Sequence, residues 1–126
     1  LPALSFANGT LKSHEGCAVT LVVDGDTVKL FCPDQGFVTA RLMGFDTPEI
    51  FSPSCLSELA QGLTATAWLN AALLRASHIA ESPEGTDRYG RRLTRLSLDG
   101  EDVTRPLVAR GLAHPYAGGK REGWCA

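Results

Sequence analysis

The chain has 126 residues, of which 44% are apolar and 21% charged, and its formal net charge is −2. This length and balance are typical of one globular domain with one hydrophobic core. They argue against a strongly basic nucleic-acid coat protein, and no apolar run approaches the roughly 20 residues of a membrane span. We expect residues 1–15, which lack clear periodicity, to form a loosely structured arm, and residues 16–126 to form a single domain.

The first part of that domain is predicted to contain three β-strands. Residues 18–23 and 27–31 are rich in β-branched and apolar side chains, and Asp24 and Gly25 lie between them as a tight turn. Residues 37–42 follow with an alternating pattern that predicts a third strand.

A long helix is expected next. Ser57 is a good N-cap, and an acidic residue follows it where it favours the helix dipole. The helix should end at about Arg75. Apolar residues at helical spacing predict its buried face, which consists of Leu59, Ala60, Leu63, Ala67, Trp68, Ala71 and Leu74.

Two further strands and a short helix complete the predicted domain. The strands are residues 77–81 and 92–98, and residues 83–90 form a polar loop between them. Thr104 can cap a short helix that stops at Gly111. This order suits a mainly β, α+β fold, a five-stranded OB-fold barrel with one long and one short helix, which often binds oligonucleotides.

Three segments carry the polar residues that indicate chemistry. They read VDGDT at residues 23–27, RLMGFDTPE at residues 41–49 and DRYGR at residues 87–91. Carboxylates on tight turns can gather a hard cation such as Ca²⁺. Guanidinium groups bind phosphate oxygens in a bidentate way. Together these segments indicate a divalent-metal phosphodiesterase site.

In sequence and order, these segments resemble the staphylococcal (thermonuclease-type) nuclease family. The resemblance continues through residues 99–103 and 107–113, so it runs from about residue 17 to residue 116. It implies an OB-fold barrel and a Ca²⁺-dependent nuclease. Such an enzyme would hydrolyse DNA and RNA at the P–O5′ bond and leave 3′-phosphates. We expect a monomer without a membrane or protein partner.

The resemblance also implies roles for the acidic residues. Asp26 and Asp46 would bind the metal together with the backbone carbonyl of Thr47, and Asp24 would lie beside them or only form the turn. Glu49 would act as the general base that deprotonates a water molecule. The alternative is that the Asp residues only make turns and that Glu49 is a solvated loop residue.

The basic and aromatic residues are assigned on the same ground. Arg41 and Arg91 match the family's two phosphate-binding arginines, although Arg41 could instead lie on the surface. Arg88 and Tyr89 resemble a substrate-binding pair at the rim, where Tyr89 could stack on a base. Tyr116 matches the substrate side less closely, and a packing or surface tyrosine is the alternative.

Two other functions are compatible with the sequence. One is an OB-type nucleic-acid-binding module that has lost catalysis, and the full set of acidic residues and arginines argues against it. The other is a calcium-stabilised structural domain without a phosphodiester substrate, against which the arginines argue.

Four cysteines indicate the cellular compartment. Cys17 and Cys32 flank the first two strands and come opposite each other in an antiparallel pair, which predicts a disulfide. Cys55 is then left to pair with Cys125, and the alternative is four buried thiols. Disulfides imply an oxidising compartment, here the periplasm or the exterior of the cell.

The end of the chain departs from the family. The best-known member continues into a long charged helix, for which this chain has no room after Tyr116. We expect packing of Trp124 and the disulfide of Cys125 to replace that helix.

Overall fold

The β-branched segment near the start of the domain forms β2 (Ala18–Asp24), and a two-residue turn returns the chain as β3 (Thr27–Cys32). β4 (Gly36–Leu42) then pairs with β3 in antiparallel register. All three strands are therefore where the sequence predicted them. The computed structural model describes residues 13–116 and 123–125, so most of the predicted N-terminal arm lies outside the described residues.

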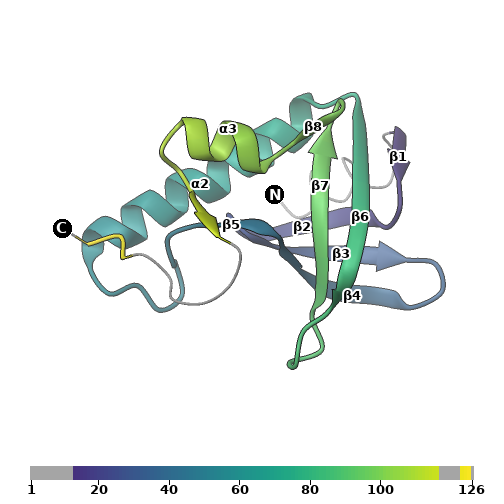
Figure 1. The fold of residues 1–126 in the computed structure, drawn as a ribbon, viewed down its shortest axis with the longest axis horizontal. Helices are drawn as coiled ribbons and strands as arrows, with labels where there is room; N and C mark the ends of the chain where they lie inside the picture. The colour runs from purple at the N-terminus through teal and green to yellow at the C-terminus, as the bar shows by residue number, and fades with distance from the viewer. Residues whose placement is uncertain (1–12, 117–122, 126) are drawn as a thin grey trace.

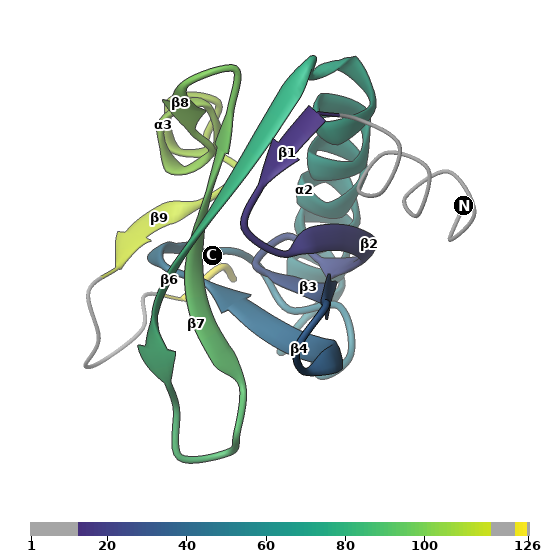
Figure 2. The same cartoon turned by 90° about the vertical axis from the view of Figure 1, so that its right-hand side faces the viewer.

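The main sheet is curled, and its two edge strands, β1 and β2, are consecutive in the chain. Its order is β1-β6-β7-β4-β3-β2, with β6 (His78–Thr86) and β7 (Arg92–Leu98) as an antiparallel hairpin. β1 (Ser13–Glu15) pairs in parallel with β6, and only residues 16–17 separate β1 from β2. One bent segment thus supplies both edges of the sheet (Figure 2), and the expected α+β, OB-like fold is confirmed.

The β6–β7 hairpin is longer than predicted. β6 continues through Thr86, so the expected loop over residues 83–90 is wrong in its first half. The register shifts between Pro83 and Gly85, and this irregularity lets a segment with turn-like composition remain in the sheet. The end of the hairpin, residues 87–91, projects away from the rest of the sheet (Figure 1).

The long helix α2 (Leu56–Arg75) ends as predicted but begins differently. Its N-cap is Cys55, whose sulfur accepts a hydrogen bond from the Glu58 amide at 3.4 Å. The prediction of Ser57 as the cap is wrong, because the helix begins before that residue.

The predicted buried face of α2 is also wrong. Leu63 and Leu74 are 52% and 46% exposed. Apolar residues occur on all sides of this helix, so their spacing alone could not select the correct face. The buried face consists of Glu58, Gly62, Ala65, Leu69, Ala72 and Leu73.

The short helix α3 (Thr104–Ala109) follows β8 (Glu101–Asp102), which pairs with β7. Its N-cap is Val103, so Thr104 is not the cap. Instead, the Asp102 carboxylate accepts a hydrogen bond from the Thr104 amide at 2.8 Å. The Asp102 side chain therefore accepts the hydrogen bond at the start of α3 that we expected the Thr104 side chain to accept.

A second, two-stranded sheet was not foreseen. β5 (Gly44–Asp46) pairs with β9 (His114–Tyr116), and Asp46 lies opposite His114. These strands are too short to show a periodic pattern, and their pairing joins segments far apart in the sequence. The pairing places Tyr116 opposite Gly44, at the start of β5.

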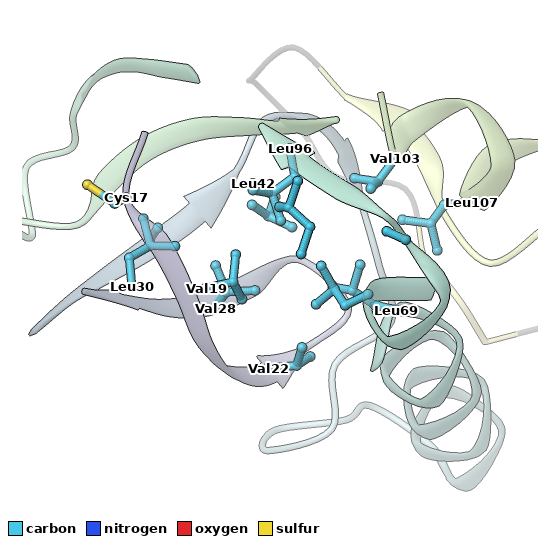
Figure 3. Close-up of a cluster of buried hydrophobic side chains, with 14 of the residues drawn as sticks. Cys17, Val19, Val22, Val28, Leu30, Leu42, Leu69, Leu96, Val103 and Leu107 are labelled. Atoms are coloured by element: carbon cyan, nitrogen blue, oxygen red, sulfur yellow. The ribbon is translucent and has the colours of Figure 1, made fainter. Parts of the chain in front are cut away.

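The core lies between the curled sheet and the two helices (Figure 3). Leu30, Leu42 and Leu96 from the sheet are fully buried, as are Leu69 of α2 and Leu107 of α3. Burial of each such side chain contributes about 1.5–3 kcal/mol. This packing fixes α2 and α3 on the sheet whose strands end in the polar turns. None of the helices in the described residues is long and apolar enough to cross a membrane.

Both predicted disulfides are present. Cys17 and Cys32 join the start of β2 to the end of β3, with their Cα atoms 4.7 Å apart. Cys55 and Cys125 are 70 residues apart in sequence and join the start of α2 to the end of the chain. In the chain-entropy account, a loop of that length contributes about 4 kcal/mol. The two bonds indicate an oxidising, non-cytosolic compartment.

Trp124 packs as expected. Its ring stacks on that of His114 in β9, with centroids 3.8 Å apart and an interplanar angle of 2°. The Trp124 carbonyl also accepts a hydrogen bond from the Gln61 side chain of α2. The end of the chain thus connects β9 to the first half of α2.

Candidate active site

The polar turns of the chain surround one cavity of about 290 Å³. Its lining joins the β2–β3 turn, β4, β5 and the end of the β6–β7 hairpin. The acidic residues and the two arginines of the three sequence motifs therefore meet at one cavity. The lining consists of Asp24, Asp26, Thr27, Arg41, Asp46, Glu49, Arg91 and Tyr116.

The β2–β3 turn places two buried carboxylates at this cavity. Asp24 is 8% exposed and Asp26 is 7% exposed. The Asp26 amide donates a hydrogen bond to Asp24 Oδ1 at 3.1 Å, and the Thr27 hydroxyl donates to Asp26 Oδ1 at 3.3 Å. The turn therefore orients Asp24 through the backbone and Asp26 through its neighbouring side chain.

The turn is locked onto the segment that follows β5. The amide of Thr47 donates a hydrogen bond to Asp26 Oδ2 at 3.2 Å. A Cβ atom on Gly25 would lie 2.8 Å from the Thr47 side chain, so only glycine permits this approach. Thr47, expected to offer its carbonyl to a metal, is thus held against Asp26.

Arg41 extends from β4 between the two expected metal ligands. Its Nη1 atom lies 3.3 Å from Asp26 Oδ2, and its Nη2 atom lies 3.6 Å from Asp46 Oδ1. The guanidinium also donates to the carbonyls of Leu42 at 2.6 Å and Phe45 at 3.2 Å. Arg41 is therefore not a surface arginine, and it neutralises part of the cavity's negative charge.

The charge that remains is large enough to perturb an acid. Burial raises the pKa of Asp24 to about 7, and the negative charge of Asp26 adds to this effect. Such a shift indicates that carboxylates are buried close to one another. Crowded carboxylates with perturbed pKa values are common at functional sites, because function requires charge in a place where folding does not favour it.

The donor chemistry of the cavity fits a hard divalent cation. Asp26 and Asp46 offer oxygen only, which suits Ca²⁺ or Mg²⁺. Within the described residues, no group of three or more His, Cys, Asp or Glu side chains is arranged as a ready metal cluster. A cation here would use few side chains and complete its coordination with backbone oxygen and water, as such ions commonly do.

Arg91 reaches the same cavity from the end of the β6–β7 hairpin. The Asp87 carboxylate accepts hydrogen bonds from Arg91 Nε at 2.7 Å and from the Arg91 amide at 2.8 Å. Burial acts to raise the pKa of Asp87, but the bonds from Arg91 outweigh it and hold this pKa below its ordinary value. Asp87 thus fixes the direction of the Arg91 guanidinium.

The remaining predicted substrate residues divide into two groups. Tyr116 lines the cavity from β9. Arg88 and Tyr89 are not among the lining residues and lie on the end of the hairpin, where Tyr89 is 72% exposed. Arg88 donates to the Tyr89 hydroxyl at 2.9 Å and lies 5.0 Å from the ring centroid. This pair faces solvent near Arg91.

Glu58 of α2 lies outside the cavity lining but contacts the backbone that carries Glu49, a role that the sequence did not predict. Glu58 Oε2 accepts a hydrogen bond from the Glu49 amide at 3.1 Å, and its Oε1 accepts one from the Ser54 amide at 2.7 Å. An acidic residue three positions after an N-cap often bonds backward to the amide of the N-cap residue, and Glu58 reaches further back, to the amides of two residues that precede the cap. Placing the cap at Ser57 instead of Cys55 concealed that signal.

Comparison with known protein families gives one finding. The family described as "Staphylococcal nuclease homologue" matches residues 39–123, which is more than half of the chain. The matched region begins in β4 and includes Arg41, Asp46, Glu49 and Arg91. The β2–β3 turn with Asp26 lies before it and meets it at the cavity.

Proposed function

Because the chain belongs to the staphylococcal nuclease homologue family, we propose that it is a Ca²⁺-dependent nuclease that hydrolyses DNA and RNA at the P–O5′ bond and leaves 3′-phosphates. The disulfides support action in an oxidising compartment, and we infer the periplasm or the exterior of the cell.

The observation that carries this proposal is the composition of the cavity. Carboxylates from two turns and arginines from two other elements line the same space of about 290 Å³. Phosphodiester hydrolysis builds negative charge on the phosphate oxygens, which arginines stabilise. Acidic residues alone would repel a polyanion, so the mixture favours a site that holds a cation and a phosphate together.

In this proposal Asp26 and Asp46 hold the cation, with the backbone carbonyl of Thr47 as a third donor. Ca²⁺, when bound, supplies positive charge that polarises the phosphate and promotes ionisation of water. Glu49 lines the cavity and takes the proton from the attacking water as general base.

The arginines bind the phosphate. Asp87 orients Arg91, whose fork then offers two parallel hydrogen bonds to phosphate oxygens. Arg41 can donate to a phosphate only by giving up one of its carboxylate contacts. Arg41 therefore binds phosphate only if another cation takes its place at Asp26 or Asp46. Tyr116 in the cavity and the exposed Arg88–Tyr89 pair would contact the nucleotides on either side of the scissile bond.

The test is a cleavage assay on DNA and RNA oligonucleotides, with Ca²⁺ and with EDTA, for the parent, Asp46→Ala and Asp46→Asn. Asp34→Ala is the matched control, because Asp34 is an exposed aspartate on the β3–β4 turn. We expect cleavage with Ca²⁺ by the parent and by Asp34→Ala, and loss of cleavage with EDTA or in either Asp46 variant.

Two other outcomes would contradict the proposal and identify its rivals. Oligonucleotide binding without cleavage in every condition would indicate an OB-type binding module without catalysis. Calcium binding with neither cleavage nor oligonucleotide binding would indicate a calcium-stabilised structural domain.

A further inference from the structure

The backbone that carries Glu49 contacts α2 at two places on the face that the sequence failed to predict. We propose that Glu58 and Gly62 of α2 fix the position of loop 48–50 and so hold Glu49 where it can accept the proton. Both are positioning residues, which act on the reaction through Glu49. This inference rests on the proposed nuclease function and adds to it the device that orients the general base.

Glu58 binds both ends of the segment before α2. Its two carboxylate oxygens accept hydrogen bonds from the Glu49 amide at 3.1 Å and the Ser54 amide at 2.7 Å. The residue is only 6% exposed. A carboxylate this deeply buried is unfavourable unless it accepts strong hydrogen bonds. The two amides therefore keep the carboxylate in place, and the carboxylate in turn keeps the segment over α2.

Gly62 provides a second contact one turn later on the same helix face. A Cβ atom at this position would lie 2.5 Å from Ile50 Cγ2 and 2.8 Å from the Pro48 carbonyl oxygen. Loop 48–50 thus packs directly on the helix backbone. Glycine is unfavourable inside a helix relative to alanine, so this close approach gives a reason for its presence.

Helix capping alone does not account for the contacts of Glu58. In a capping box, the acidic side chain bonds backward to the amide of the N-cap residue, which here is Cys55. Glu58 instead bonds to the amides of Ser54 and of Glu49, nine positions earlier. The bond to Glu49 satisfies no amide of the helix, so it serves the loop.

The loop needs such a restraint because Glu49 has open space on two sides. It lines the cavity of about 290 Å³ that contains the acidic residues and arginines. It also lines a neighbouring cavity of about 350 Å³, together with Ser54, Glu58 and Trp124. A loop released from α2 could move toward this second cavity and carry Glu49 away from the phosphate.

The test measures kcat and KM with a DNA oligonucleotide for Glu58→Gln and Gly62→Ala, each made in the parent and in Glu49→Gln. Glutamine has one acceptor oxygen, so it cannot accept from both amides. Alanine favours the helix but displaces the loop. In the parent background we expect each change to lower kcat roughly 10- to 100-fold with little change in KM, because small misplacements of a catalytic group cost this much. In Glu49→Gln we expect at most about a twofold effect.

Glu81→Gln is the matched control. Glu81 is also a buried glutamate that accepts a backbone amide, that of Cys17 at 2.9 Å, and it does not line the cavity. At a temperature where it is folded, we expect its kcat to equal that of the parent. An equal loss of kcat from Glu58→Gln in both Glu49 backgrounds would overturn the positioning role.

Hydrogen exchange of the Glu49 amide gives a readout that does not require activity. We expect Glu58→Gln to accelerate exchange at Glu49, while the Val103 amide, bonded to Leu96 in the barrel, exchanges as in the parent. Unchanged exchange at Glu49 would also overturn the inference. A parent protein that cleaves nothing would contradict the nuclease function alone, and exchange at Glu49 would still decide whether Glu58 holds the loop.

Discussion

Two regions of this protein bury carboxylates in opposite ways. In the barrel seam, defined here as Glu81 with Cys17, Arg92 and Thr94, one acid has a full set of donors. Arg92 Nε donates to Glu81 at 2.8 Å, and the Cys17 amide and the Thr94 hydroxyl complete the set. In the cavity, Asp24, Asp26 and Asp46 line the same space, and Arg41 contacts Asp26 and Asp46.

The pKa values follow this difference. Burial acts to raise the pKa of Glu81, but hydrogen bonds from Arg92, Thr94 and the Cys17 amide outweigh it and hold the pKa below the ordinary value. Burial and the charge of Asp26 raise the pKa of Asp24 to about 7. Ionisation of Glu81 thus stabilises the folded protein, whereas ionisation of Asp24 destabilises it. A buried carboxylate whose ionisation opposes folding is typical of a functional site, where the reaction or a ligand requires the charge.

The largest expected effect is on catalysis at the cavity. Glu49→Gln keeps the size of the side chain and one acceptor oxygen but cannot accept the proton from water. We expect turnover to fall by roughly two to four orders of magnitude, the usual range for a general base. Steady-state cleavage of a DNA oligonucleotide with saturating Ca²⁺ measures it. Turnover within about twofold of the parent would remove Glu49 from that role.

Arg91→Lys is the next test of the cavity. Lysine retains the charge, but its single ammonium cannot form two parallel bonds to a phosphate. We expect kcat to fall roughly 100-fold, the lower end of the range for loss of one transition-state donor, because lysine keeps the charge. The control is Arg105→Lys, a change of the same type in the first turn of α3 and outside the cavity lining. Equal activity of the two variants would show that the fork at Arg91 is not needed.

Glu81→Gln tests the seam, where we expect stability rather than chemistry to change. The variant loses the charge that Arg92 faces, so its free energy of unfolding at neutral pH should fall by about 2 kcal/mol. A lowered folded pKa means that the contribution of Glu81 is fully present above the unfolded value of 4.5 and is lost as the pH falls through the folded value.

The difference between parent and Glu81→Gln should therefore narrow at about pH 3, as measured by urea unfolding. If the difference in unfolding free energy between the two proteins stays constant from neutral to acidic pH, the ionised form of Glu81 does not stabilise the fold more than the protonated form. A loss of kcat in the folded variant would contradict the separation of seam and cavity.

The smallest expected effect has the opposite sign. Asp24→Asn removes a buried charge beside Asp26, while the amide oxygen can still accept from the Asp26 amide. In EDTA at pH 8 we expect the free energy of unfolding to rise by about 1 kcal/mol. Because the folded pKa is raised from 3.8 to about 7, the cost of ionising Asp24 builds up between these two pH values and is complete above about pH 7. The gain should therefore disappear below pH 3.8, where Asp24 is protonated in both states. A loss of stability at pH 8 would contradict the crowding of charge in the cavity.

The sequence predicted best where neighbouring residues determine the structure. Strand alternation and the turn at Asp24 and Gly25 gave β2 and β3, and the hairpin that they form put Cys17 opposite Cys32. The three polar motifs also predicted which acidic residues and arginines would meet at one cavity. Local propensity and tight-turn chemistry are sufficient for these features.

The sequence could not predict features that depend on long-range packing. The β5–β9 pairing, the parallel contact of β1 with β6 and the buried face of α2 have no periodic signal of their own. Arg41 was expected to meet phosphate, but its contacts with Asp26 and Asp46 appear only once β4 and β5 are placed. Glu58 was read as a helix-dipole residue because its partner, the Glu49 amide, belongs to a loop of irregular shape.

Calcium-dependent unfolding and cleavage in matched variants tests most directly whether the cavity, and not the seam, carries the function. A cation that binds only the folded protein raises Tm. We predict that Ca²⁺ raises Tm by the same amount in the parent and Glu81→Gln and supports cleavage by both, and that it does neither in Asp46→Asn. An equal rise in Tm with equal cleavage in Asp46→Asn would contradict the assignment of the cavity as the active site.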